Sequence, residues 1–158
     1  MSDDVVMEIR PSIFRRWMAL IALGGLSIIL LGVAIGDLPD LWRLFFVLIA
    51  VWVLWSGNRL RLSTLNGLVL TRSALSTSTG EVLVKVENIQ KVERGVFAFK
   101  PSNGFLVRLI EPAPKGWAPG LWWRFGTRLG VGGTLSGGQS RAMADLMSAL
   151  VLERDSEN

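Results

Sequence analysis

The sequence lacks three residue types that carry much of protein chemistry: its 158 residues include no cysteine, histidine or tyrosine. Without cysteine, the chain has no disulfide bond, thiolate metal ligand or cysteine nucleophile. Without histidine and tyrosine, it lacks the most common general base and metal ligand, and the phenolic acid or base. The spacing of its carboxylates pairs no two of them for proton transfer or metal binding. We therefore expect a non-catalytic protein with no cofactor and no metal.

Charge is also scarce. Only 19% of the residues are charged, compared with about 25% in a typical soluble domain, and 50% are apolar. The length allows one compact domain, or a small domain with a membrane anchor. Because the apolar excess is concentrated in two runs, residues 18–36 and 41–57, the second arrangement is favoured.

The two runs predict a transmembrane helical hairpin. Residues 18–36 contain no charge and would form a helix of roughly 28 Å, close to the thickness of the hydrocarbon core. Residues 41–57 contain one charge, Arg43, which can reach the headgroups by snorkelling. Pro39 and its neighbouring aspartates suit a tight turn between the runs. Residues 32–36 form a GxxxG motif, which we expect to pack against the second helix or, alternatively, to form a dimer seam.

Two other structures fit the same hydropathy. Two core helices of a soluble protein are one alternative, but the remaining residues are too few to cover helices that are apolar all round. A cleaved signal peptide is the other, since residues 34–36 have the small-x-small pattern of a cleavage site. The acidic residues among the first 17, and the second apolar run, argue against a signal peptide.

Basic residues set the expected orientation. Three arginines precede the first run and three follow the second, whereas the turn between them is flanked by one. Positive charge stays on the cytoplasmic side, so we expect both termini in the cytoplasm, including an N-terminal segment over residues 1–17. Basic and aromatic residues at the ends of the runs are the expected interfacial anchors. They are Arg15, Arg16, Trp17, Trp42, Arg43 and Trp55.

From residue 58 onward apolar and polar residues alternate, which is typical of half-buried strands. We expect six or seven antiparallel strands in a domain over residues 58–153. The first would cover residues 59–63 (RLRLS) and turn back at Asn66–Gly67, and later ones would cover residues 89–100, bent at Gly95, and 121–129. Residues 111–120 contain three prolines and are expected to be irregular.

The end of the domain predicts a helix. Ser136 and Gln139 have the spacing of a capping box. Four apolar residues then recur at helical spacing and would cover one face of a sheet: Met143, Leu146, Met147 and Leu150. Residues 154–158 are expected to be a frayed tail.

This order of elements resembles the small bacterial membrane proteins with a two-helix hairpin and a pleckstrin-homology-like domain. The resemblance covers the hairpin and residues 58–153, and includes the patches at residues 59–63 and 87–92 (ENIQKV). It implies a membrane-anchored α+β fold: a hairpin, then a bent antiparallel β-barrel or sandwich capped by the C-terminal helix, in the bacterial inner membrane. It also implies an interaction module, often self-associating. Family members that bind phosphoinositides carry basic clusters in the first hairpin loop, and residues 65–67 (LNG) do not.

Residues 135–139 read LSGGQ, which matches the signature motif of ABC-transporter ATPases. That chemistry also requires a P-loop lysine that follows glycine, and none of the four lysines here does so. We interpret the motif as a helix N-terminus. The glycines at residues 130–133 lack the spacing of a dinucleotide-binding loop and are interpreted as a turn.

One segment has the composition of a contact surface. Three of the seven tryptophans lie within residues 115–128, together with basic residues. The candidates for a membrane-interface or partner contact are Lys115, Trp117, Trp122, Trp123, Arg124 and Arg128. Alternatively, Trp122 or Trp123 belongs to the core, because neighbouring strand residues face opposite ways.

We therefore expect an integral inner-membrane protein whose cytosolic domain binds a protein partner or a second copy at the membrane surface. Its partners would be membrane lipids and a protein, and no nucleic acid, because its basic residues are scattered. The alternative is an accessory subunit of a larger membrane complex, in which the hairpin carries the specificity.

Overall fold

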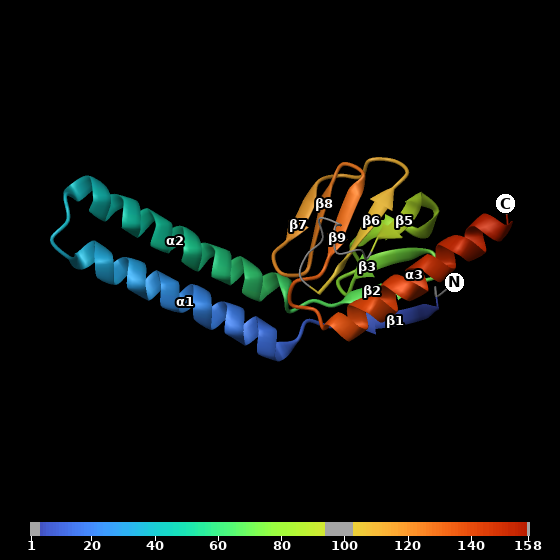
Figure 1. Ribbon diagram of the computed structural model, residues 1–158, viewed down its shortest axis with the longest axis horizontal. Helices are drawn as coiled ribbons and strands as arrows, with labels where there is room; N and C mark the ends of the chain where they lie inside the picture. The colour runs from blue at the N-terminus through green and yellow to red at the C-terminus, as the bar shows by residue number, and fades with distance from the viewer. Residues whose placement is uncertain (1–3, 94–102, 158) are drawn as a thin grey trace.

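The computed structural model describes residues 4–93 and 103–157 (Figure 1). In these ranges the chain forms two long helices, two antiparallel sheets and a C-terminal helix, which is an α+β fold. The two long helices extend away from the sheets, whereas the C-terminal helix lies beside the sheets (Figure 1).

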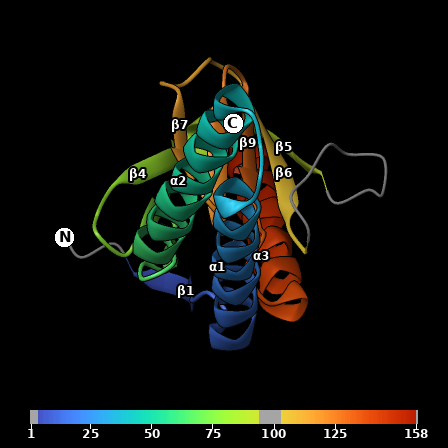
Figure 2. The same ribbon diagram turned by 90° about the vertical axis from the view of Figure 1, so that its left-hand side faces the viewer.

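The hairpin consists of α1 (Ile13–Ile35) and α2 (Asp40–Ser63), which lie side by side (Figures 1 and 2). Both are long and apolar enough to cross a membrane, and only 11% of the most apolar stretch of each is buried. Pro39 stands at the N-cap of α2, as its helix-ending role predicts. The GxxxG prediction is wrong for this hairpin: a Cβ on Gly32 would meet nothing within 4 Å. Instead, Gly57 of α2 faces α1, where its Cβ would lie 3.7 Å from Leu23 Cδ1.

The first sheet has the order β1-β2-β3-β4, with all neighbours antiparallel. Its strands are β1 (Val5–Ile9), β2 (Leu68–Thr71), β3 (Ala74–Thr77) and β4 (Val82–Lys85). No strand was expected in the segment before the hairpin, yet β1 pairs along β2, with Ile9 opposite Leu68. Both side chains are fully buried, and their burial explains why the segment joins the sheet.

The second sheet has the order β5-β6-β9-β8-β7, again antiparallel. Its strands are β5 (Ile89–Glu93), β6 (Phe105–Leu109), β7 (Gly116–Ala118), β8 (Trp122–Phe125) and β9 (Arg128–Val131). A short 3-10 turn, η1 (Val86–Asn88), joins the two sheets. The predicted continuation of a strand to residue 100, with its bend at Gly95, lies outside the described residues.

Five predictions about the strands are wrong. The described residues contain nine strands, eight of them after residue 58 where six or seven were expected, and they form two sheets instead of the closed barrel that was one of the two expected forms. Residues 59–63 are the last turn and a half of α2, where Leu60 is buried by contacts distant in sequence. Residues 121–129 fold back at Gly126, which has a φ of +55°, to give β8 and β9. The proline-rich stretch contains β7 between Pro114 and Pro119.

The helix α3 (Gly137–Glu157) begins where the capping box predicts. The backbone N–H of Gln139 donates to Ser136 Oγ at 3.3 Å. α3 packs against β1 of one sheet and against β5 and β6 of the other. It continues through the segment expected to fray, where Arg154 donates to the carbonyls of Val86 and Ile89 at 2.8 Å each.

The core lies between the two sheets and α3. The predicted stripe is confirmed, since Met143 and Met147 are fully buried and Leu146 and Leu150 are partly buried against them. The largest fully buried side chains are Ile9, Leu68, Leu70, Leu75, Leu83, Ile89, Phe105, Leu121, Leu129, Leu135, Met143 and Met147.

Candidate functional site: an aromatic surface beside the hairpin

Strand pairing decides which aromatic residues of the 115–128 segment face outward. β7 and β8 pair with Trp117 opposite Trp123, so these two side chains share one face of the sheet. Phe125, two residues after Trp123, is on the same face. Trp122 and Arg124 occupy the alternate positions and point to the interior, where they are 5% and 7% exposed.

Arg124 connects the two sheets from inside. Its Nε donates to the Pro114 carbonyl at 2.5 Å, and one terminal nitrogen donates to the Leu83 carbonyl of β4 at 2.6 Å. The guanidinium carbon also lies 5.6 Å from the centre of the Trp122 ring. Backbone carbonyls therefore satisfy this buried charge, and neither Arg124 nor Trp122 belongs to an exposed contact surface.

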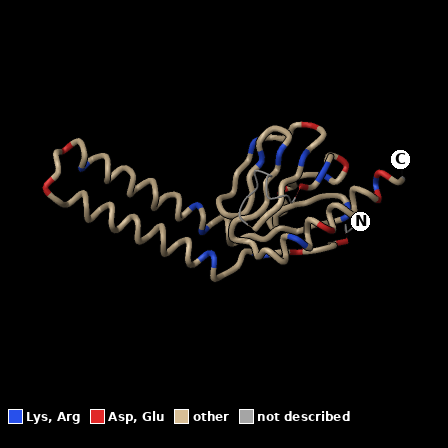
Figure 3. Tube along the Cα trace, in the orientation of Figure 1, with Lys and Arg blue, Asp and Glu red and all other residues tan. Residues whose placement is uncertain are grey.

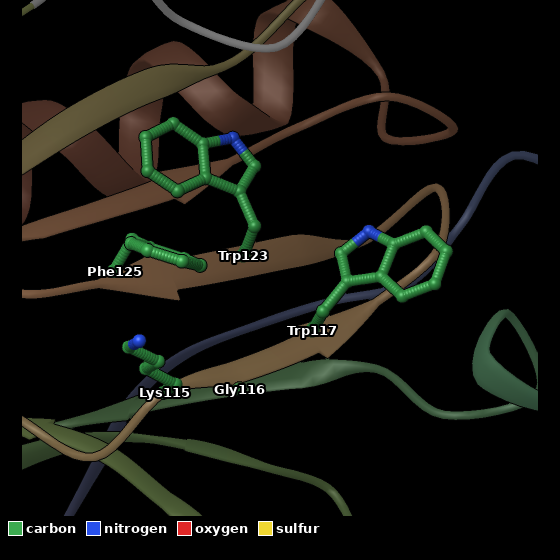
Figure 4. A pocket seen from close by; sticks show the side chains of 5 residues that line it. All are labelled: Lys115, Gly116, Trp117, Trp123 and Phe125. Carbon is green, nitrogen blue, oxygen red and sulfur yellow. The ribbon is translucent and has the colours of Figure 1, made fainter.

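The residues that remain outside form what we call the aromatic surface: Lys115, Gly116, Trp117, Trp123 and Phe125. They line an open hollow of about 590 Å³ (Figure 4). Trp117 and Phe125 are 57% and 62% exposed. Lys115 Nζ lies 4.8 Å from the centre of the Phe125 ring, in a cation–π contact. Phe125 was not among the predicted site residues, although its spacing of two from Trp123 is the signal that identifies it.

Two glycines leave the space that the tryptophan rings occupy. A Cβ on Gly130 of β9 would overlap the ring of Trp123, so this ring lies against a strand that has no side chain there. A Cβ on Gly116 of β7 would lie 2.7 Å from the ring of Trp122 on the inner face. The interpretation of residues 130–133 as a turn is therefore wrong for Gly130, which belongs to β9 and is needed for packing.

Arg128 lies at the edge of this surface. It stands opposite Phe125 in the β8–β9 pairing, which puts both side chains on the outer face, and it is exposed. Of the six residues predicted as a contact, the structure thus brings Lys115, Trp117, Trp123 and Arg128 together on this face.

The turn between β7 and β8 is attached to the end of the hairpin. Ser63 Oγ donates to the Pro119 carbonyl at 2.6 Å. The position of a Cβ on Gly120 is 2.5 Å from Leu60 Cδ1, which shows how closely α2 approaches the turn. On the α1 side, the Ser12 N–H donates to the Thr134 carbonyl at 2.8 Å, and Thr134 Oγ1 donates to the Gly120 carbonyl at 2.7 Å. β7 is accordingly the strand of its sheet nearest the hairpin (Figure 1).

The predicted interfacial anchors lie at the two ends of the hairpin. Because α1 and α2 are antiparallel, the arginines and tryptophan at the start of α1 are at the same end as Trp55, near the domain. Figure 3 shows basic residues at this end of both helices. There the Arg59 guanidinium carbon lies 5.4 Å from the centre of the Trp55 ring. At the far end, Arg43 is 3.4 Å from Asp40 Oδ1. The residues at the domain end are Arg15, Arg16, Trp17 and Trp55, and those at the far end are Trp42 and Arg43.

Among the residues that the structure describes, no three acidic, cysteine or histidine side chains gather as metal ligands. Comparison of the chain with protein-family models, with curated proteins and with solved structures gives no match.

Proposed function

We propose that the chain is an integral membrane protein whose cytosolic, pleckstrin-homology-like domain is a non-catalytic binding module. It would take a protein partner or a second copy of itself at the membrane surface. The observation that carries this proposal is the hollow of the aromatic surface, which is open, apolar and attached to the end of two membrane-length helices.

Exposed apolar area supports the membrane part of the proposal. Both helices of the hairpin are exposed along nearly their whole apolar length, and water solvates such a surface poorly. The acidic residues of the hairpin, Asp37 and Asp40, lie at the far end, whereas arginines cluster at the domain end (Figure 3). This asymmetry favours a cytoplasmic location for the domain.

The shape of the aromatic surface favours a protein over the lipid bilayer as its partner. Side chains that insert into a bilayer usually extend together from a loop, whereas Trp117, Trp123 and Phe125 stand on two paired strands and line an open hollow (Figure 4). A hollow of about 590 Å³ can receive apolar side chains from a partner. Tryptophan and arginine are enriched among the residues that dominate binding energy in protein interfaces. Lys115 and Arg128 at its edges favour a partner with acidic residues around its apolar centre.

The test is photo-crosslinking of the full chain in its membrane. A benzophenone amino acid would replace Phe125 and, as a matched control, Leu152 of α3, which is 70% exposed. We expect a protein adduct, with another protein or at twice the mass of the chain, from position 125 only. The adduct should disappear with Trp117→Ala. Adducts with phospholipid alone, or equal protein adducts from position 152, would overturn the proposal.

The hairpin itself offers a second candidate, the accessory subunit in which the helices carry the specificity. The observation in its favour is that Gly24, Gly25 and Gly32 of α1 all face open space, which leaves room for the close approach of another helix. Exchange of the hairpin for an unrelated one distinguishes the two candidates. Loss of the partner on this exchange, with retention in Trp117→Ala, would favour the hairpin.

A further inference from the structure

A second hollow lies between the helices of the hairpin, close to the end that joins the domain. Its volume is about 180 Å³. Leucine side chains of both helices form its apolar walls, and Asn58 and Arg61 of α2 form its domain end. Its lining includes Leu20, Gly24, Leu54, Gly57, Asn58 and Arg61.

The groove exists because two glycines line it. A Cβ on Gly24 would meet nothing within 4 Å, so no other residue occupies the space beside this glycine. Gly57 lets α2 approach α1, with Leu23 Cδ1 3.7 Å from its Cβ position. The helices therefore touch near Gly57, and a cavity open to the outside remains beside Gly24.

Positive charge lies at the domain end of the groove. Arg61 lines the groove and is exposed. Arg16 is four residues before Leu20, which puts it on the same side of α1 and one turn closer to the domain. Within the described part of the chain neither guanidinium forms an ion pair, and both acidic residues of the hairpin, Asp37 and Asp40, lie at its other end.

We propose that this groove is a binding site for one acyl chain of an anionic phospholipid, whose phosphate lies between Arg16 and Arg61. The inference rests on the proposed insertion of the hairpin into a membrane. A groove on the bilayer-facing side of two helices is filled by lipid chains, and an arginine pair selects among them by charge-assisted hydrogen bonds to phosphate. Asn58 adds a neutral donor at the same end.

The distances along α2 match this assignment. Gly57 ends the apolar run, and Arg61 follows it by four residues, about 6 Å of helix rise. The headgroup layer on each side of a bilayer is roughly 5–8 Å thick, from the difference between its total and hydrocarbon thickness. An acyl chain beside Gly24 thus places its phosphate at the depth of Arg61.

The test is retention of lipid by the full chain, measured by native mass spectrometry after reconstitution with equal amounts of phosphatidylcholine and phosphatidylglycerol. We expect a single phosphatidylglycerol to remain bound in preference to phosphatidylcholine. Arg61→Gln should weaken its retention on the order of fivefold to tenfold, a loss typical of one charge-assisted phosphate contact. The matched control is Arg59→Gln, because Arg59 stacks on Trp55 and does not line the groove.

Gly24→Leu provides an independent test, because Gly24 lines the groove and a Cβ there meets no atom within 4 Å, so a larger side chain has room to reduce the space for a lipid chain. Its control is Gly32→Leu, which also faces open space but lies two turns further along α1. Gly24→Leu should abolish the preference for phosphatidylglycerol, and Gly32→Leu should leave it intact. Circular dichroism would verify equal helix content in both variants.

Three results would overturn the site: equal retention of the two lipids, equal losses in Arg59→Gln and Arg61→Gln, or an intact preference in Gly24→Leu. If soluble glycerol phosphate displaced the bound lipid, and Gly24→Leu did not change lipid retention, the two arginines would be assigned to a site for free phosphate instead. The outcome is separate from that of the proposed function, because lipid retention does not require Phe125. Cross-linking at Phe125 likewise does not require an anionic lipid in the groove.

Discussion

Ser63 and Pro119 are 56 residues apart in the sequence, yet the Ser63 hydroxyl donates to the Pro119 carbonyl at 2.6 Å. Ser63 is the last residue of α2, and Pro119 is in the turn that joins β7 to β8. The hydrogen bond therefore couples the hairpin directly to the strands that carry the aromatic surface. A movement of α2 relative to the domain has to break this bond or move these strands.

Ser63→Ala should loosen this connection. Loss of one partly buried hydrogen bond lowers the free energy of unfolding by about 1 kcal/mol. Denaturant unfolding of the detergent-solubilised chain would measure the change. The matched control is Ser56→Ala, whose hydroxyl bonds only to the Trp52 carbonyl of its own helix and is exposed. Equal effects of the two substitutions would show that the contact with Pro119 contributes nothing.

Gly130→Ala should displace Trp123, because the added methyl group overlaps its ring. Overpacking of this kind costs about 1–3 kcal/mol of unfolding free energy. The displaced ring should also change the near-ultraviolet circular dichroism of the domain. Gly138→Ala in α3 is the control, since its Cβ meets nothing within 4 Å. An unchanged spectrum and unchanged stability in Gly130→Ala would refute the packing described for Trp123.

Arg124→Met should destabilise the domain, although it removes a charge from a buried position. The Leu83 carbonyl, which accepts from Arg124 in a buried hydrogen bond, loses this donor, and the Pro114 carbonyl loses a partly buried one, at a cost of about 1–3 kcal/mol. Arg128 on the neighbouring strand is exposed, so Arg128→Met should change the free energy of unfolding by about 0.5 kcal/mol at most. The measurement is thermal unfolding of the two variants in parallel. An Arg124→Met variant more stable than the unsubstituted protein would contradict the role of Arg124 in joining the sheets.

The absence of cysteine makes topology simple to measure. Single cysteines at Asp37, in the hairpin turn, and at Leu152, on α3, would be treated in intact cells with a membrane-impermeant maleimide. We expect only the Asp37→Cys variant to react, because the arginines at the domain end of the hairpin favour the proposed cytoplasmic side for the domain. Reaction of Leu152→Cys before lysis would put the domain outside. Reaction of both would show that the helices do not form a transmembrane hairpin.

Local patterns in the sequence predicted those features that depend on neighbours along the chain. Hydropathy located α1 and α2, the capping box located the start of α3, and alternation separated Trp122 from Trp123. In each case the feature is determined by residues only a few positions apart, so the pattern that predicts it is visible in the sequence.

Features that depend on distant contacts were not predictable. Residues 59–63 alternate as a strand would, but Leu60 packs against Gly120, and α2 continues to Ser63. Arg124 was expected on the surface, because one of its acceptors, the Leu83 carbonyl of β4, becomes its neighbour only when the two sheets meet. Periodicity alone cannot decide such cases, because tertiary packing overrides local preference.

The pairing of β1 with β2 has a consequence for how the chain is made. β1 is synthesised before the hairpin and β2 after it, and they meet with Ile9 opposite Leu68. In a chain whose helices both cross a bilayer, this ladder forms only when the two flanks of the hairpin emerge on the same side. A nascent chain with one helix left uninserted, or with its N-terminus translocated, leaves β2 without its edge partner and Leu68 uncovered. In the proposed topology, the β1–β2 ladder is therefore complete only in a chain whose hairpin has inserted with both flanks on one side.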